Sequence, residues 1–357
     1  MTGRERLIAA LNHREGDRVP IFECVYSRPL FREVLGHIPE TFDPVSVFTC
    51  YEKIGYDFAF MPIPGVSGFR PEGTAGDEYT DEWGITYRKA VETWPIDAVV
   101  KPPLATVEDI KNYRLPDPAA DFRWKGYREV IKMSKSNGMG VVGNMRGPYS
   151  GTWMLFGMDT FSYLFYDDPD ALDGILSAVT DFSIACFKIM AKEGADALVF
   201  SDDYGSTNSP LFSLEHFRRF FAPQIKRMLD AAKEMGIPLI MHSDGFIHPF
   251  IEDSVNMGIA GLHPIERAAQ MNLADVKRKY GDKICILGNV DNKELLVHGS
   301  VEQVEEQVKE CIRIAGSGGG YCLGSDHSVH DDIPNRNVFA LYEAGRKYGA
   351  YPLKLDN

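Results

Sequence analysis

The stretch Pro238-Leu239-Ile240-Met241-His242-Ser243-Asp244-Gly245 passes directly from a short apolar run into polar groups that can bind a metal ion or move protons. A second stretch, residues 318–330, has the same order, with a glycine run, an apolar segment and then Asp326, His327 and His330. Each pattern is typical of a short buried strand that ends on polar side chains. We therefore predict that the fold brings the ends of these two strands together.

The rest of the chain alternates apolar runs with amphipathic stretches. The strands that this pattern predicts are Ile21–Val25, Tyr56–Met61, Gly140–Asn144, Ala197–Ser201, Pro238–His242, Ala260–His263, Ile284–Gly288 and Gly320–Gly324. The predicted helices between the later strands are Ala171–Lys192, Leu214–Met235, Ile247–Asn256, Leu273–Tyr280 and Val301–Ala315. Alternating strands and helices indicate a parallel sheet, and eight such units close most naturally into a (β/α)8 TIM barrel.

An open, doubly wound sheet is the alternative fold. It would require a glycine-rich phosphate loop after the first strand, and residues 23–29 do not form one. An N-terminal helical extension is predicted over Arg6–Leu11, because Thr2 and Glu5 have the spacing of a capping box. We expect residues 1–357 to form one domain.

A long insertion, residues 62–138, follows the second strand and lacks regular periodicity. It is typical of a hairpin plus a short helix, and it is too long for an ordinary connection. Such segments usually cover a site or form an interface. We predict that this insertion covers the barrel mouth or contacts the second subunit of a homodimer, burying Trp83, Tyr87 and Trp94.

Composition excludes several classes of function. The net charge of −13 and the absence of basic clusters argue against a nucleic-acid partner. The sequence has no run of about 18 apolar residues, so we predict no membrane partner. The six cysteines show no C-x-x-C spacing and lie in apolar contexts, which is typical of reduced thiols in a cytoplasmic protein.

The C-terminal ends of the strands should carry the chemistry of such a barrel. His242 and Asp244 are the most specific pair of candidate ligands, because residues i and i+2 of a strand project to the same side and could reach one ion or substrate. His327 could supply a third ligand from the last strand and leave one position open, as catalytic zinc sites do. The alternative is a hydrogen-bonded His–Asp pair without a metal ion. His263 and His330 are expected to support the ligands or to be structural.

Other residues at the strand ends complete the candidate site. Asp203 and Glu23 are candidates for proton transfer, although Asp202 and Asp203 equally fit an Asx turn at a loop start. Glu266 is expected to orient a ligand histidine. The candidates for substrate contact are the apolar and polar side chains Tyr26, Met61, Met145, Arg146, Trp153, Tyr204 and Asn289.

Several motifs, taken in order, resemble one superfamily over nearly the whole chain. They are Arg4-Glu5-Arg6, Asp17-Arg18-Val19-Pro20, Asp81-Glu82-Trp83-Gly84, residues 211–217, residues 286–291 and residues 324–337. Their order and spacing are similar to those of the uroporphyrinogen decarboxylase superfamily. The resemblance implies a (β/α)8 barrel, in agreement with the alternation of strands and helices.

One branch of that superfamily, the porphyrinogen decarboxylases, works without a cofactor. It uses an arginine-rich loop after the first strand and an aspartate after the second. Here the first loop, residues 25–29, has one arginine, and the second, residues 61–64, has no acid. We therefore do not expect a substrate with many carboxylates, although His327 matches this branch.

The other branch contains the corrinoid-dependent methyltransferases, whose thiol-methylating members bind zinc through H-x-C and a later cysteine. This chain has His242-Ser243-Asp244 and His327 at those positions. Nitrogen and oxygen ligands leave a stronger Lewis acid, better suited to an oxygen atom. The resemblance thus implies zinc, and transfer of a methyl group from a methoxylated aromatic or similar small donor. The acceptor would be a cobalamin on a partner corrinoid protein, because no D-x-H-x-x-G motif is present here.

Three alternative functions remain at this stage. The first is a cofactor-free decarboxylase of a smaller acid, with Arg146 or Arg28 holding the carboxylate. The second is a methylcobalamin:thiol methyltransferase. The third is a binding protein that keeps the barrel and has no turnover.

Overall fold

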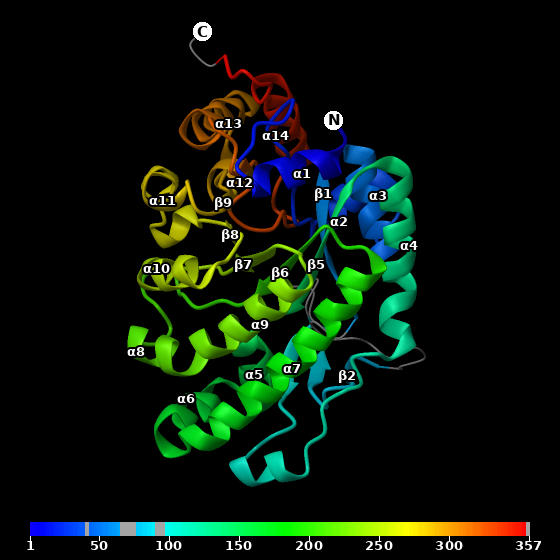
Figure 1. Cartoon of the computed structure of the whole chain (residues 1–357). Coiled ribbons are helices and arrows are strands. Elements are labelled where there is room, and N and C mark those ends of the chain that lie inside the picture. Colours follow the sequence, from blue (N-terminus) through cyan, green and yellow to red (C-terminus); the bar gives the residue numbers. More distant parts are fainter. Residues whose placement is uncertain (40–42, 65–75, 90–96, 355–357) are drawn as a thin grey trace.

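The computed structural model describes residues 1–39, 43–64, 76–89 and 97–354, and a curved parallel sheet forms its centre (Figure 1). In this described part of the chain seven strands pair in the order β1-β5-β6-β7-β8-β9-β10. The strands are β1 (Phe58–Pro62), β5 (Gly140–Arg146), β6 (Ala197–Ser201), β7 (Leu239–His242), β8 (Gly261–His263), β9 (Cys285–Leu287) and β10 (Tyr321–Cys322). Each of them lies where the sequence pattern predicts a strand.

The eighth position of the ring is taken by the predicted first strand, Ile21–Val25, which forms isolated parallel bridges rather than a regular strand. On one side the Phe22 N–H donates to the Leu323 carbonyl over 3.0 Å. On the other side the Asp57 N–H, just before β1, donates to the Ile21 carbonyl over 2.8 Å. The fold is therefore TIM-barrel-like, as predicted.

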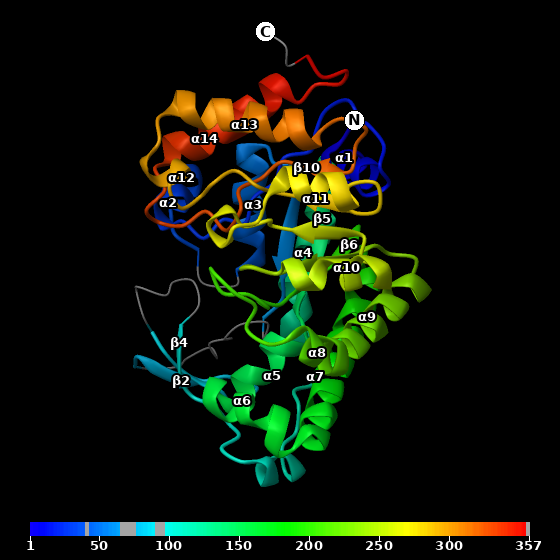
Figure 2. The same cartoon turned by 90° about the vertical axis from the view of Figure 1, so that its left-hand side faces the viewer.

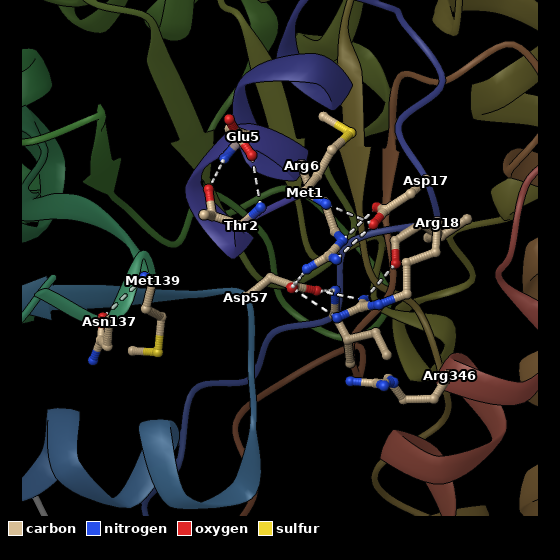
Figure 3. Close-up of polar contacts among 12 residues, drawn as sticks. Met1, Thr2, Glu5, Arg6, Asp17, Arg18, Asp57, Asn137, Met139 and Arg346 are labelled. Carbon is tan, nitrogen blue, oxygen red and sulfur yellow. Dashed lines mark hydrogen bonds and ion pairs between the residues drawn. The ribbon is translucent and has the colours of Figure 1, made fainter. Parts of the chain in front are cut away.

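A buried ionic network holds this closing segment in place (Figure 3). The Asp57 carboxylate, 2% exposed, accepts both terminal nitrogens of Arg18 at 2.6 and 2.8 Å. It also accepts the Ile21 N–H at 2.7 Å and Arg6 at 2.9 Å. A two-pronged contact between guanidinium and carboxylate combines charge with fixed geometry. This network explains the Asp17-Arg18-Val19-Pro20 motif, because Arg18 anchors the chain just before the segment that closes the ring.

Asp57→Asn should destabilise the protein by about 3–5 kcal/mol, because it leaves the buried Arg18 guanidinium without its counter-charge. The matched control is Asp17→Asn, since the Asp17 side chain is 43% exposed and binds Arg6 at the surface. Its expected cost is below about 1 kcal/mol. Urea unfolding of both variants measures the difference, and equal costs would show that the Asp57 network does not hold the barrel closed.

Helices surround the sheet on its outer side (Figures 1 and 2). The α-helices are α1 (Gly3–Leu11), α2 (Arg28–Leu35), α3 (Pro44–Ile54), α4 (Asp121–Asn137), α5 (Pro148–Phe156), α6 (Met158–Asp167), α7 (Pro169–Glu193), α8 (Leu214–His216), α9 (Ala222–Glu234), α10 (His248–Met257), α11 (Leu273–Tyr280), α12 (Leu295–His298), α13 (Val301–Ala315) and α14 (Asn335–Tyr348). Short 3-10 helices occur at η1 (Val107–Lys111) and η3 (Arg267–Ala269), and a π-helical turn, η2 (Phe217–Phe221), joins α8 to α9. The five helices predicted between the later strands are confirmed, whereas α2, α5, α6, α12 and α14 were not predicted.

Helix α1 closes the N-terminal end of the barrel. Thr2 and Glu5 form the predicted capping box at its start. Its Leu7 and Leu11 belong to the same buried cluster as the interior barrel residues Phe58 and Val142. The N-terminal extension is thus part of the barrel core, and the open end of the barrel is the end at which the strands finish.

Helix α7 is long and apolar enough to cross a membrane by length and composition alone. Its apolar residues, such as Leu176, Val179 and Phe187, are buried in the main core of this protein. The helix packs against β5, α5 and α9. Its composition is that of a core helix of the barrel.

The insertion contains a three-stranded antiparallel sheet in its described part, made of β2 (Glu78–Thr80), β3 (Thr86–Arg88) and β4 (Ala98–Lys101). This sheet lies beside α5 and α6 in Figure 2. Its Trp83 packs edge-on against Phe182 of α7, with ring centres 4.7 Å apart. The Leu104 N–H donates to the Leu155 carbonyl of α5 over 3.0 Å. The insertion is therefore attached to the barrel wall next to the end of β5.

The predicted limits of the insertion need one correction. Residues 62–138 were expected to hold a hairpin and a short helix, but α4 spans 17 residues and packs on α3, directly before β5. It is the outer helix that connects β1 to β5 and belongs to the barrel. Trp83 and Tyr87 are buried, as expected, while Trp94 lies outside the described residues. Contact of the insertion with a second subunit stays a prediction.

Candidate active site

Four neighbouring strands place polar side chains in one row at the open end of the barrel. Backbone register pairs Arg146 of β5 with Ser201 of β6, Ser201 with His242 of β7, and His242 with His263 of β8. Two residues before His242, Ile240 belongs to the interior cluster of the barrel. Because side chains alternate along a strand, the residues of this row also face inwards. They line the barrel mouth.

His242 and His263 contact each other through their ring nitrogens. The two Nδ1 atoms lie 2.6 Å apart, so one of them donates a proton to the other. Burial, followed by the nearby His242, lowers the pKa of His263 well below its ordinary value, which keeps the His263 ring neutral. When His242 is the donor, its Nε2 lone pair faces the acids Asp203 and Asp244. His263 therefore supports His242, as predicted.

Asp203, His242 and Asp244 form a cluster that fits a metal ion. Their ligand atoms all lie within 4.8 Å of one another. His242 Nε2 is 3.7 Å from Asp244 Oδ2 and 3.8 Å from Asp203 Oδ1, which is too long for hydrogen bonds. In addition, Asp244 Oδ1 is buried and has no hydrogen-bond partner among the described residues. Nitrogen and carboxylate oxygen are ordinary ligands of zinc, which binds them at about 2.0–2.2 Å.

His327 joins this cluster through Asp244. Its Nε2 lies 2.9 Å from Asp244 Oδ2, and the Ser328 N–H donates to its Nδ1 over 2.8 Å. Burial lowers the pKa of His327, but the charge and hydrogen bond of Asp244 outweigh burial and raise it to about 9. The amide on Nδ1 favours the neutral ring, whereas Asp244 favours the charged one. Both forms carry the proton on Nε2.

The structure brings the predicted ligands His242, Asp244 and His327 together, but they do not form the predicted group of three metal ligands. Asp203 takes the third position of the converging group, and His327 is a hydrogen-bond partner of Asp244. Burial opposes ionisation of Asp244, but the nearby His242 and His327 hold the pKa of Asp244 below its ordinary range. Asp244 is therefore a carboxylate that both histidines share.

The two adjacent acids after β6 have different roles. Asp202 is buried and accepts the N–H groups of Tyr149 and Ser150 at the start of α5, together with the Tyr204 hydroxyl. Asp203 points into the mouth and accepts the Asp244 N–H over 3.2 Å. Although 57% of its side chain is accessible, desolvation by the surrounding walls and the charge of Asp244 raise the pKa of Asp203. Asp202 is the structural residue, and Asp203 belongs to the site.

Glu23, a predicted catalytic acid, supports the site from outside the barrel. Its Oε1 accepts the Ser325 N–H at 2.7 Å, and its Oε2 lies 2.6 Å from the Ser325 hydroxyl, which also contacts the His327 carbonyl. One hydroxyl proton cannot serve both acceptors. The pattern is complete when Glu23 is protonated and donates to the hydroxyl, and burial raises the pKa of Glu23 to about 8. At 1% exposure it does not reach a substrate and instead positions the segment carrying His327.

Several residues predicted to contact a substrate are buried elsewhere. Met61 and Met145 lie in the outer layer between the sheet and the helices, because their neighbours in the strands face inwards. Tyr204 is fully buried among aromatic rings, including Phe212 at 5.7 Å. Asn289 is also fully buried, and its amide donates to the Ile265 carbonyl over 2.8 Å. These four positions are structural.

The other predicted residues have different surroundings. Arg146 is part of the inward row, and Tyr26 is half-buried and near enough to Asp244 to be affected by its charge. Trp153 of α5 is half-buried and packs against the main core. Cys24, which was not predicted as a site residue, packs against the interior cluster two residues after Phe22. The i, i+2 spacing from Phe22 could have revealed it. Burial, followed by the charges of Glu23 and Asp244, raises the pKa of the Cys24 thiol, which favours its protonated form.

Two further predicted residues stand at the edge of the site. Glu266 was expected to orient a ligand histidine, but its Oε2 accepts the Gly245 N–H over 2.7 Å. It thereby fixes the turn that follows Asp244. His330 lies on the rim with 40% of its side chain exposed.

Glu23→Gln should reproduce the protonated carboxyl, since its amide can donate to the Ser325 hydroxyl while its carbonyl accepts the Ser325 N–H. The folded pKa of about 8 lies above the ordinary 4.5, so the contribution of this proton is full below pH 4.5 and is lost as pH rises through about 8. The wild-type free energy of unfolding should therefore fall by up to about 1.4 kcal/mol per pH unit across this range. The variant should lack that component of the slope.

Urea unfolding at several pH values between these limits measures both slopes. The control is Glu78→Gln, because the Glu78 side chain is 54% exposed and should leave the wild-type slope unchanged. An identical slope in wild type and Glu23→Gln would mean that Glu23 is ionised in the folded protein.

A family model described as uroporphyrinogen decarboxylase (URO-D) matches residues 91–348, which include the strands from β5 to β10 and the segments that carry His242, Asp244 and His327. The chain belongs to this family. The uroporphyrinogen decarboxylase of Actinobacillus succinogenes is 23% identical over 257 residues, covering 69% of this chain and 70% of the relative. That of Vibrio campbellii is 23% identical and covers 74% of each chain.

Within the solved structures, a methyltransferase from Methanosarcina mazei has the same fold. It superposes with a TM-score of 0.78 and covers 98% of this chain and 99% of its own length. The sequence identity is 21%, so this likeness establishes the shared barrel. The family relationship and the fold agree with the resemblance carried by the sequence motifs.

Proposed function

We propose that this family member is a methyltransferase that moves a methyl group from a small donor, a methoxylated aromatic, to cobalamin on a partner corrinoid protein. The observation that carries the proposal is the cluster of Asp203, His242 and Asp244, which offers nitrogen and oxygen but no thiolate. Such ligands suit an ion that acts on oxygen rather than on a thiol. The fold shared with the Methanosarcina mazei methyltransferase supports the same reaction class.

Zinc held by these three residues would supply a Lewis acid that polarises the ether oxygen of the donor. The protein's own contribution begins with His263, whose Nδ1 lies 2.6 Å from Nδ1 of His242. With His263 as the acceptor, this hydrogen bond would fix the direction of the ligand nitrogen Nε2 of His242. His327 holds Asp244 by a hydrogen bond at 2.9 Å and limits its rotation. Asp203 lies on the accessible side of the cluster, so a further ligand of the ion would enter from the barrel mouth.

His327 is placed to give a proton to the departing oxygen. In this reaction the methyl carbon would pass to the corrinoid on the partner protein, and the electron pair of the broken C–O bond would stay on the oxygen. The His327 Nε2 carries a proton, and 44% of the side chain is accessible from the mouth. Neutral pH lies about 3 units below the pKa of about 10 of a phenol, so this proton is worth roughly 4 kcal/mol.

His327→Gln should keep the metal and lose methyl transfer by about 100-fold or more, because the metal group does not include His327. His242→Ala should lose both. Elemental analysis of protein purified without added metal, together with methyl transfer from a methoxylated aromatic to Co(I) corrinoid, measures the two properties. His330→Gln is the matched control on the rim and should change neither.

The opposite result would be equally clear. Wild-type protein without metal, and without a gain in thermal stability on adding zinc, would rule out the metal site. Full methyl transfer by His327→Gln would remove this histidine from the chemistry.

The position of Arg146 in the inward row favours a second function. Its guanidinium could hold the carboxylate of a small acid for cofactor-free decarboxylation, and the similar proteins are uroporphyrinogen decarboxylases. Turnover of a small acid by protein stripped of metal would favour this second function over methyl transfer.

A further inference from the structure

Arg146 is a half-buried cation that forms no contact ion pair among the described residues, although the carboxylates of Asp81, Asp202 and Asp203 lie near enough to favour its charged form. Among the described residues its guanidinium makes no ion pair or hydrogen bond. Burial lowers the pKa of Arg146, whereas the charges of the nearby acidic groups raise it, and an arginine guanidinium stays protonated in proteins. Arg28, the other arginine considered as an anchor, is already engaged by Asp331. A partly desolvated guanidinium whose N–H groups make no hydrogen bond can still donate to a group that binds from outside, and such a group would offset the cost of desolvation.

The guanidinium borders a small cavity between the insertion and the barrel. This cavity has a volume of about 20 Å³, and Arg146, Asp81, Trp83, Tyr87 and Met154 are among its lining residues. A space of that size accepts about one water molecule or the tip of a ligand, and no whole ring. The cavity is therefore suited to the end group of a molecule that extends beyond it.

Asp81, on the opposite side of the cavity, is incompletely bonded as well. It is 6% exposed, and its Oδ1 accepts the N–H groups of Trp83 and Ile85. Its Oδ2 is buried and has no hydrogen-bond partner among the described residues. Asp81 and Arg146 favour each other's charge but are not in contact as an ion pair. A guanidinium without a hydrogen bond and a carboxylate with one unbonded oxygen therefore border one cavity, which suits a polar group between them.

Arg146 also stands at the level of the metal-type cluster. The register row runs from Arg146 through Ser201 to His242, so two strand spacings of about 4.8 Å separate their backbones. A ligand whose charged end and reacting end are about one aromatic ring apart can bridge that separation. Trp83 and Tyr87 provide apolar surface next to its charged end.

We propose that Arg146 binds the carboxylate of the substrate and that this protein therefore acts on a small monocarboxylic acid. The planar guanidinium matches a carboxylate with two parallel hydrogen bonds. The inference rests on the proposed function only in taking the mouth as the place of reaction. It gives the methyl donor a carboxylate, and it holds equally for the decarboxylation alternative.

The test is a binding measurement with two ligands that differ in charge, 4-methoxybenzoate and 4-methoxybenzamide. Calorimetry on metal-loaded wild-type protein should show at least tenfold tighter binding of the benzoate. Arg146→Gln should lose this preference and bind the amide as wild type does. Arg146→Lys, which keeps the charge without the planar fork, should bind the benzoate several-fold more weakly than wild type. Arg28→Gln is the matched control and should keep the full preference.

Equal affinity of wild type for the two ligands, or no binding of either, would overturn the inference. A folded Arg146→Gln variant that still prefers the benzoate would do the same, and if that variant does not fold, unchanged benzoate binding by Arg146→Lys decides against it. No corrinoid and no turnover enter these measurements. A benzoate preference in a protein that transfers no methyl group would sustain the acid site and end the methyltransferase proposal. Methyl transfer by a protein that binds both ligands equally would sustain the methyltransferase proposal and end the proposal of an acid site.

Discussion

The buried Asp57 carboxylate is the constraint on which the mouth of this barrel depends. By holding Arg18 and the Ile21 N–H, it keeps an irregular segment in the eighth position of the sheet. That segment carries Glu23, which in turn fixes the Ser325–His327 turn. A network at the closed end of the barrel thus determines where a histidine stands at the open end. The contacts of Asp57 and Glu23, which lie away from any substrate, therefore set the geometry of the barrel mouth.

The alternation of strands and helices was predictable because apolar runs and helix caps are local signals. The helix Val301–Ala315 begins at a Ser300 capping box, and its limits follow from the sequence alone. The inward or outward direction of each strand residue was not predictable, because both faces of a barrel strand are apolar. Met61 and Met145 were placed in the mouth for that reason, although they lie in the outer layer.

The candidate site was predictable where chemistry and spacing coincide, as in His242 and Asp244. The adjacent acids Asp202 and Asp203, by contrast, could not be told apart by residue type or spacing. Asp202 binds the free amides at the start of α5, a helix that was not predicted, and this leaves Asp203 to the mouth. Asp81 belongs to an insertion without periodicity, so only the folded chain brings it opposite Arg146. The missing information in each case concerns which distant segments meet.

Because α1 closes one end of the barrel, it affects how molecules reach and leave the site. Leu7 and Leu11 of α1 fill the barrel interior from the floor, so in the described part of the chain small molecules reach the site from the end at which the strands finish. A partner protein that covered this mouth would block the entry and exit of a small molecule for as long as it stayed bound. Substrate entry, reaction with the partner and product release would then occur one after another.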